Sequence, residues 1–149
     1  MGSGFSLREP RNDVLLCLPI GALSIKVAYV FATGNATTFK LATMILPQLE
    51  AGTHGAEVIG MMFFDDNIFA LRKGDEIGER LAAVAKKHGI LLMVCDQCAV
   101  RRNMAEGTFE QCGTGSVKAK GFVDGVVASC FPQLYGALSG NPPDQVITL

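Results

Sequence analysis

Apolar residues gather in short runs that alternate with amphipathic stretches along most of the chain. Near-continuous apolar runs over residues 24–32, 57–64 and 90–95 predict strands of a sheet that is covered on both faces. Two further runs, over residues 117–122 and 145–149, are also rich in strand-forming residues. The pattern therefore predicts five strands.

The most clearly marked helix lies between the second and third predicted strands. Asp75 is a suitable N-cap, and Gly89 is a suitable C-terminal stop. Between them, Ile77, Leu81 and Val84 recur at helical spacing and form an apolar stripe. We expect this stripe to pack against the sheet.

Three other segments have helical patterns with weaker boundaries. Residues 37–49 show apolar positions at helical spacing, and Pro47 is expected to distort the last turn. A short helix is expected over residues 97–105, after the third strand. Residues 124–138 predict a helix that is interrupted by Pro132.

Strands that alternate with helices predict a parallel sheet. We therefore expect a three-layer α/β domain over residues 24–149, flavodoxin/Rossmann-like, with a mainly parallel five-stranded sheet and helices on both faces. Residues 1–23 are expected to form an N-terminal arm and an extra strand. Asp13 abuts the apolar run there, and Pro19 and Gly21 break it, so we interpret the run as a strand rather than a secretory signal.

Composition and charge narrow the possible partners. The 149 residues are 49% hydrophobic and carry a net charge of −1, which favours a folded domain and does not favour a nucleic-acid partner. No uninterrupted apolar run reaches the length of a membrane span. The five cysteines have irregular spacing, unlike a secreted disulfide framework, so a reducing cytoplasm is the expected location.

The candidate chemistry lies after the predicted strands. Ligands of open parallel sheets bind beyond the carboxyl ends of the strands, where we expect the loops 33–36, 65–73 and 95–104 to meet. Cys95 stands where a strand gives way to a helix, and free backbone N–H groups there favour an anion. Arg101 and Arg102 follow, and both effects are expected to lower the pKa of the Cys95 thiol and favour the reactive thiolate.

The interpretation of Cys95 has a plainer alternative. Asp96 raises the thiol pKa if its side chain points the same way, and the sequence leaves that balance open. An inert buried cysteine at the end of a strand is the alternative from position alone. The reactive interpretation expects a sulfur at the edge of the sheet that is open to solvent and inclined to lose its proton. It fails if the side chain lies deep among aliphatic residues with no pocket and no polar neighbours.

Three segments together resemble the DsrE/DsrF/TusD-like family of sulfur-relay proteins, over about residues 24–149. They are the cysteine segment Cys95, Ala99-Val100, Arg101-Arg102, Asn103 and Met104, the strand end Phe63-Phe64-Asp65-Asp66-Asn67-Ile68, and the closing strand Asp144-Gln145-Val146-Ile147-Thr148-Leu149. Asn67 and Asn103 stand where the family has glycine, so we expect left-handed backbone at both. Cys98 is a further departure, because it creates a Cys-x-x-Cys motif.

The resemblance implies a sulfur carrier or sulfurtransferase. By this resemblance, Cys95 is expected to accept sulfane sulfur as a persulfide and to pass it to a partner thiol, with Cys98 as an auxiliary thiol. The residues expected to bind the substrate are Arg101, Arg102, Asp65, Asp66 and Asn67. The implied partners are sulfur donor and acceptor proteins, and a homo-oligomer, trimer or hexamer, is implied as well. No cofactor and no resident metal are expected.

The Cys-x-x-Cys motif supports an alternative function. Cys95 and Cys98 together suit a soft-metal-binding module or a dithiol/disulfide redox module. Cys98 also suits a small packing residue that faces the core. Cys112 lies in a glycine-rich loop that is close in sequence, and its approach to Cys95 is an open possibility, whereas Cys17 and Cys130 are expected to be packing residues.

Overall fold

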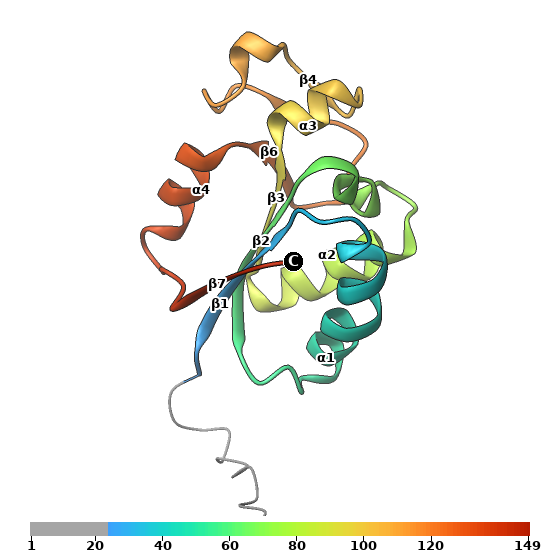
Figure 1. Ribbon diagram of the computed structural model, residues 1–149, viewed down its shortest axis with the longest axis vertical. Coiled ribbons are helices and arrows are strands. Elements are labelled where there is room, and N and C mark those ends of the chain that lie inside the picture. The colour runs from blue at the N-terminus through green and yellow to red at the C-terminus, as the bar shows by residue number, and fades with distance from the viewer. Residues whose placement is uncertain (1–23) are drawn as a thin grey trace, which may run out of the picture.

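The computed structural model describes residues 24–149, and its centre is a five-stranded sheet in which every strand is parallel to its neighbours (Figure 1). The strands are β1 (Lys26–Phe31), β2 (Glu57–Phe63), β3 (Leu91–Cys95), β6 (Val126–Ser129) and β7 (Gln145–Thr148). Their order across the sheet is β6-β3-β2-β1-β7. The predicted fold class is confirmed, while the predicted extra N-terminal strand falls outside the described residues.

Helices cover both faces of this sheet. The helical segments are η1 (Ala36–Ile45), α1 (Leu46–Ala51), η2 (Asp65–Leu71), α2 (Glu76–His88), α3 (Asp96–Arg101), η3 (Phe109–Gln111) and α4 (Phe131–Leu138). In Figure 1, α1 and α2 lie on one side of the sheet, and α4 lies on the other. The three-layer arrangement is therefore the expected one.

Helix α2 has the predicted ends. The Asp75 side chain accepts a hydrogen bond from the Ile77 N–H at 3.0 Å, and Gly89 ends the helix with a φ of 70°. Leu81 and Val84 are buried. Capping at both ends and burial of one stripe explain why local sequence was sufficient to define this element.

The first helical segment differs from its prediction at Pro47. Residues 36–45 form a π-helix, and an α-helix begins at Leu46, so Pro47 lies in the first turn of α1 rather than in a distorted last turn. Proline is tolerated there because the first N–H groups of an α-helix have no partner within the helix. Gly52, with a φ of 69°, ends α1.

The predictions for residues 117–138 were wrong in two places. The expected strand over 117–122 is only β5 (Lys118–Ala119), which pairs antiparallel with β4 (Ala105–Glu106) outside the main sheet. The fourth strand of the main sheet is β6, which had been assigned to a helix. A short apolar run fits a buried strand or a helix equally well. Pro132 lies in the first turn of α4, which begins at Phe131, and does not interrupt a longer helix.

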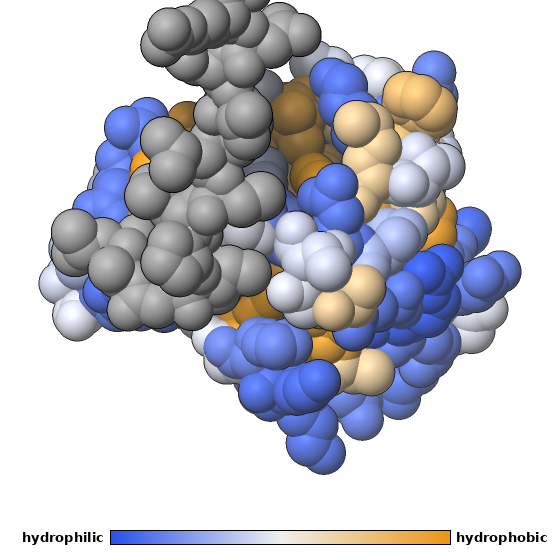
Figure 2. Space-filling model, turned by 90° about the horizontal axis from the view of Figure 1, so that it is seen from below, coloured by the Kyte–Doolittle hydropathy of each residue, from blue (hydrophilic) through white to orange (hydrophobic). Residues whose placement is uncertain are grey.

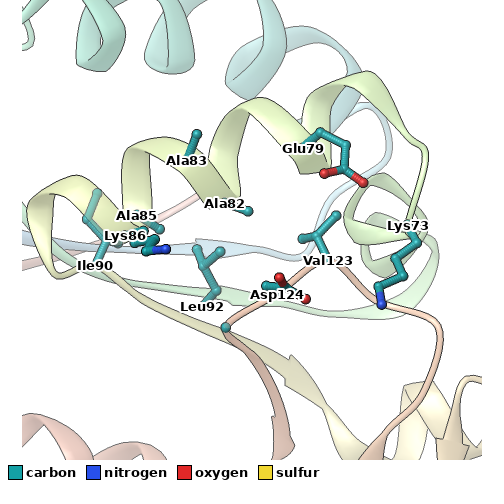
Figure 3. Close-up of a pocket in the computed structure, with 11 residues that line it drawn as sticks. Lys73, Glu79, Ala82, Ala83, Ala85, Lys86, Ile90, Leu92, Val123 and Asp124 are labelled. Carbon is teal, nitrogen blue, oxygen red and sulfur yellow. The ribbon is translucent and has the colours of Figure 1, made fainter.

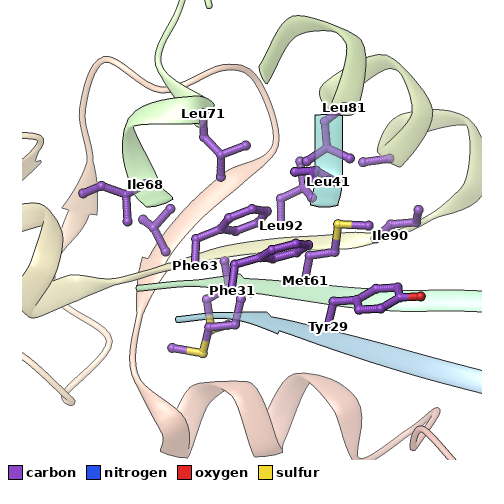
Figure 4. Close-up of a cluster of buried hydrophobic side chains, with 14 of the residues drawn as sticks. Tyr29, Phe31, Leu41, Met61, Phe63, Ile68, Leu71, Leu81, Ile90 and Leu92 are labelled. Atoms are coloured by element: carbon purple, nitrogen blue, oxygen red, sulfur yellow. The ribbon is translucent and has the colours of Figure 1, made fainter. Parts of the chain in front are cut away.

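The core lies mainly between the sheet and the α1–α2 layer (Figure 4). The rings of Phe31 and Phe63 stack with centroids 4.8 Å apart across the β1–β2 pair. On the opposite face, a Cβ at Gly60 would lie 3.4 Å from Leu138 of α4. The middle strands are therefore packed on both sides, which fixes the positions of their carboxyl ends.

The face at the amino ends of the strands is mostly hydrophilic, with hydrophobic residues showing between the polar ones (Figure 2). Within residues 24–149, no helix combines the length and the apolar character needed to cross a bilayer.

Candidate functional site

Cys95 is the last residue of β3, a central strand of the sheet. It lies opposite Ser129 of the neighbouring strand β6, and α3 begins at the next residue. The expected position at a strand-to-helix junction is therefore confirmed. Since all strands are parallel, the loops after β1, β2 and β6 open at the same edge.

Cys98 lies one helical turn beyond Cys95 and contacts it. The backbone N–H of Cys98 donates a hydrogen bond to Cys95 Sγ at 3.4 Å. Cys98 Sγ in turn accepts the backbone N–H of Asp65 at 3.2 Å, and its thiol lies 3.8 Å from Asp65 Oδ1. Each sulfur thus receives one backbone N–H, a contact that favours a negative sulfur.

The environment of Cys95 nevertheless favours the protonated thiol, contrary to the expected lowering of its pKa. Burial raises the pKa of Cys95 to about 12; the Cys98 N–H opposes this shift, while the Cys98 thiol and the Asp96 carboxylate reinforce it. Desolvation penalises the thiolate more than one weak hydrogen bond stabilises it. In the free protein, Cys95 therefore carries its proton at neutral pH.

The expected open sulfur is also corrected. Cys95 keeps 8% of its surface exposed, and Cys98 keeps 9%. Both cysteines belong to the buried core cluster. The site is a pair of buried, polar-contacted thiols rather than an exposed nucleophile.

Arg102 joins the cysteine segment to the loop after β2. Its guanidinium binds Asp66 Oδ1 at 2.7 Å and lies 3.9 Å from Asp65 Oδ1. It also donates to the backbone carbonyl of Cys98 at 3.2 Å. The charge of Arg102 is therefore directed to these two carboxylates, and it holds the Asp65–Asp66 turn over Cys98.

Arg101 points elsewhere. Its guanidinium lies over the ring of Phe109, 5.1 Å from the centroid. Phe109 is an exposed residue of η3. Although the two arginines are adjacent in sequence, the structure brings only Arg102 to the cysteine pair, because successive helical residues point about 100° apart.

Asn67 is buried and links two of the three predicted loops. Its Oδ1 accepts from the Thr37 N–H at 3.3 Å and from the Thr37 hydroxyl at 3.2 Å, and its Nδ2 donates to the Thr33 carbonyl at 3.2 Å. The prediction of left-handed backbone at this residue was wrong. Asn103, at φ 56°, confirms the second such prediction, and the left-handed residue of the β2 loop is Asp65, at φ 50°.

Asp96 is a fully buried carboxylate that sequence reasoning left undecided. Its Oδ1 accepts the Gln97 N–H, and its Oδ2 accepts the Gly113 N–H at 2.7 Å. The residue therefore anchors the glycine-rich loop to the start of α3. The sequence signal for this anchoring role is an acidic residue at the first position of a helix. The same signal is expected for a carboxylate that only stabilises the helix dipole, so it does not reveal the contact with Gly113.

A separate groove of about 630 Å³ lies beside α2 (Figure 3). Its walls come from α2, the start of β3 and the segment before β6, with Lys73, Glu79, Lys86 and Asp124 as the charged residues. Neither cysteine of the Cys-x-x-Cys motif lines it. Within residues 24–149, no three His, Cys, Asp or Glu side chains gather closely enough to hold a metal ion.

Comparisons with known proteins agree with this architecture. Residues 25–139 match the DsrE/DsrF-like family. Among solved structures, the ychN protein from E. coli superposes with a TM-score of 0.55 at 14% identity, covering 85% of this chain and 100% of its own. A protein of unknown function, MTH1491 from Methanobacterium thermoautotrophicum, gives 0.51 at 11% identity, covering 85% and 99%. A search of curated proteins gave no significant match.

The fold and the site together define a three-layer α/β protein with a thiol pair at the carboxyl edge of its parallel sheet. The family match spans most of the chain, and the chain belongs to the DsrE/DsrF-like family, which is generally related to sulfur relay.

Proposed function

We propose that this protein is a sulfur carrier or sulfurtransferase that accepts sulfane sulfur on Cys95 and passes it to a partner thiol. The observation that carries the proposal is the hydrogen bond from the Cys98 N–H to Cys95 Sγ, at the carboxyl edge of the sheet. Membership of a family related to sulfur relay supports it. Asp65, Asp66, Asn67 and Arg102 shape the loop that covers the pair. Arg101, which lies over the Phe109 ring and away from this loop, is proposed as a contact for the substrate or partner outside the cover.

The proposed loading step is a thiol–persulfide exchange. Cys95 loses its proton, and its thiolate attacks the outer sulfur of a donor persulfide. A new S–S bond forms on Cys95, the S–S bond of the donor breaks, and the donor leaves as a thiolate that takes up the proton. Because the resting thiol is protonated, the step is slow until a donor supplies a proton acceptor beside Cys95.

Mass spectrometry tests the assignment of Cys95. Reduced protein is incubated with a low-molecular persulfide, desalted, and analysed as intact protein and as peptides. We expect one added sulfur on the Cys95 peptide of the wild type, of Cys98→Ser and of the Cys17→Ser control, and none with Cys95→Ser. One added sulfur on Cys95→Ser, at the wild-type level, overturns the assignment.

A dithiol redox function is the second candidate, and the thiol pKa supports it. A pair whose thiolate is poorly stabilised forms a comparatively stable disulfide, so Cys95 and Cys98 would act as a reducing couple. Redox titration followed by thiol alkylation separates the two functions. A Cys95–Cys98 disulfide that forms reversibly, without any persulfide on incubation with the donor, favours the redox module. Loss of both thiols on addition of one equivalent of a soft metal favours the metal-binding version.

We further infer that the protein works as a homo-oligomer, a trimer or hexamer, with donor and acceptor proteins in the cytoplasm. Exposed apolar side chains on α4 and the edge strand β7 support association, notably Phe131, Tyr135 and Val146. The thiols of the described cysteines are free, which suits a reducing compartment. Light scattering coupled to size-exclusion chromatography measures the oligomeric state, and a monomer at micromolar concentration contradicts this inference.

A further inference from the structure

A third cysteine is tied to the residue that follows Cys95. The Gly113 N–H donates to the buried Asp96 carboxylate at 2.7 Å, and Cys112 immediately precedes Gly113. Cys112 is half-buried and packs against the core cluster. The glycine-rich loop therefore holds Cys112 at the same edge of the sheet as the Cys95–Cys98 pair.

A fourth cysteine is tied to the same loop through the side chain of Gln133. The Gln133 Nε2 donates to the Gly113 carbonyl at 2.8 Å, and its Oε1 accepts the Cys130 N–H at 3.2 Å. Cys130 directly follows Ser129, which lies opposite Cys95 in the sheet. One amide side chain thus links the backbones beside Cys112 and at Cys130, and both thiols are free and half-buried.

The groups that act electrostatically on the Cys112 thiol include Asp96 and Cys130, the same residues that the hydrogen bonds connect to its loop. Burial raises the pKa of the Cys112 thiol, and the Asp96 carboxylate and the Cys130 thiol raise it further. Asp96 also raises the pKa of Cys95. The Asp96 carboxylate is therefore a common neighbour of Cys95 and Cys112.

We propose that Cys112 and Cys130 form a second thiol pair that, when no partner thiol takes the sulfane sulfur, slowly removes it from Cys95 and releases it as sulfide. The proposal rests on the proposed loading of Cys95. It assigns an activity to two cysteines that the sequence presented as a loop thiol and a packing residue. Asp96 and Gln133 are positioning residues, since each holds the Cys112 loop through a backbone group of Gly113.

The chemistry balances without an added oxidant. The Cys112 thiolate attacks the outer sulfur of the Cys95 persulfide, so a persulfide forms on Cys112, and Cys95 leaves as a thiolate and takes up the proton. The Cys130 thiolate then attacks the Cys112 sulfur, a Cys112–Cys130 disulfide forms, and hydrosulfide leaves with the proton from Cys130. The sulfane sulfur gains the two electrons that the two thiols lose.

A single-turnover experiment tests the pair. Reduced protein is loaded with glutathione persulfide, desalted at once, and followed for released sulfide and for disulfide-linked peptides. In the wild type and in Cys17→Ser, we expect sulfide release together with a Cys112–Cys130 disulfide. In Cys112→Ser, sulfur stays on Cys95 and sulfide release is lost; in Cys130→Ser, sulfur stops on Cys112. Cys112→Ala repeats the test without a hydroxyl in the half-buried position.

Two results overturn the proposal in distinguishable ways. If Cys95 is loaded but sulfide release is unchanged in the Cys112 and Cys130 variants, or accompanies a Cys95–Cys98 disulfide instead, the second pair is wrong and the carrier function stands. If Cys112→Ser, in which the sulfur cannot move on, takes no sulfur on Cys95, the carrier function fails and the second pair fails with it.

Discussion

The backbone N–H of Asp65 donates a hydrogen bond to Cys98 Sγ at 3.2 Å, across 33 positions of sequence. Asp65 adopts a left-handed φ of 50°, which is uncommon for a residue with a side chain. This backbone carries the turn after β2 over the cysteine segment, where Arg102 binds the Asp66 carboxylate. Two loops that are distant in sequence thereby form one cover over the thiol pair.

The reactivity of Cys95 is predicted to keep rising with pH. Because its pKa is raised to about 12, peptide-resolved alkylation by iodoacetamide should accelerate by about tenfold per pH unit up to at least pH 9. Asp96→Asn should move the profile toward lower pH, because it removes a negative charge, although burial remains the main cause of the shift. Asp124→Asn, at an exposed carboxylate that does not contribute to the Cys95 shift, is the control and should leave the profile in place. A rate plateau below pH 9 in the wild type contradicts the raised pKa.

The same shift predicts a loss of stability at alkaline pH. The folded state holds the Cys95 proton more tightly than the unfolded chain, whose thiol has its ordinary pKa of 9.0. As pH rises above this value, the unfolded state loses its proton first, and the free energy of unfolding falls until the folded pKa is reached. Denaturation between pH 8 and about pH 11 measures this slope. An equal slope in Cys95→Ala excludes Cys95 as its source.

The two adjacent arginines are predicted to differ. Arg102→Ala removes the ion pair with Asp66 and the bond to the Cys98 carbonyl, so we expect faster hydrogen exchange in η2 and a loss of about 1 kcal/mol of stability. Arg101→Ala removes only an exposed contact with Phe109 and should change stability by less than about 0.5 kcal/mol. If the two substitutions accelerate hydrogen exchange in η2 equally, Arg102 does not hold the Asp65–Asp66 turn over the thiol pair.

Asn67 is predicted to stabilise the fold, because it links the loops after β1 and β2 at the carboxyl edge of the sheet. Asn67→Ala leaves the Thr37 N–H, the Thr37 hydroxyl and the Thr33 carbonyl without their partner and should cost about 1–3 kcal/mol. Asn141→Ala is the matched control, since Asn141 makes one exposed hydrogen bond to Lys26, and it should change stability little. Chemical denaturation measures both. An Asn67→Ala variant with the same free energy of unfolding as the wild type would show that water replaces these contacts.

Two glycine-to-alanine substitutions are predicted to differ, because η2 packs closely against α2 at Gly78 and nothing lies close to Gly136. A Cβ at Gly78 would lie 2.6 Å from the Ala70 carbonyl oxygen, so Gly78→Ala should cost about 1–3 kcal/mol. In α4, Gly136 has open space around its Cα, and Gly136→Ala should be neutral or mildly stabilising. Thermal denaturation compares the two. Similar stability of both variants indicates that η2 moves away from α2 without cost.

Local sequence determined the elements that carry their own signals. Helix α2 has a capping aspartate, an apolar stripe and a terminal glycine within one segment, and β1, β2 and β3 are continuous apolar runs. Cys95 at the end of β3 follows from the same pattern. Residues 117–138 were misassigned, because a four-residue apolar run does not distinguish a strand from a helix until its neighbour in the sheet is known.

Only the tertiary structure decided the chemistry of the site. The order of the strands places Ser129 opposite Cys95, and the rotation of α3 directs Arg102 rather than Arg101 to the carboxylates. Burial reverses the expected shift of the Cys95 pKa. Hydrogen bonds, charge contacts and desolvation depend on distances between segments that are far apart in the chain. A sequence pattern constrains which residues are available, and packing sets how far apart they lie and how much water reaches them.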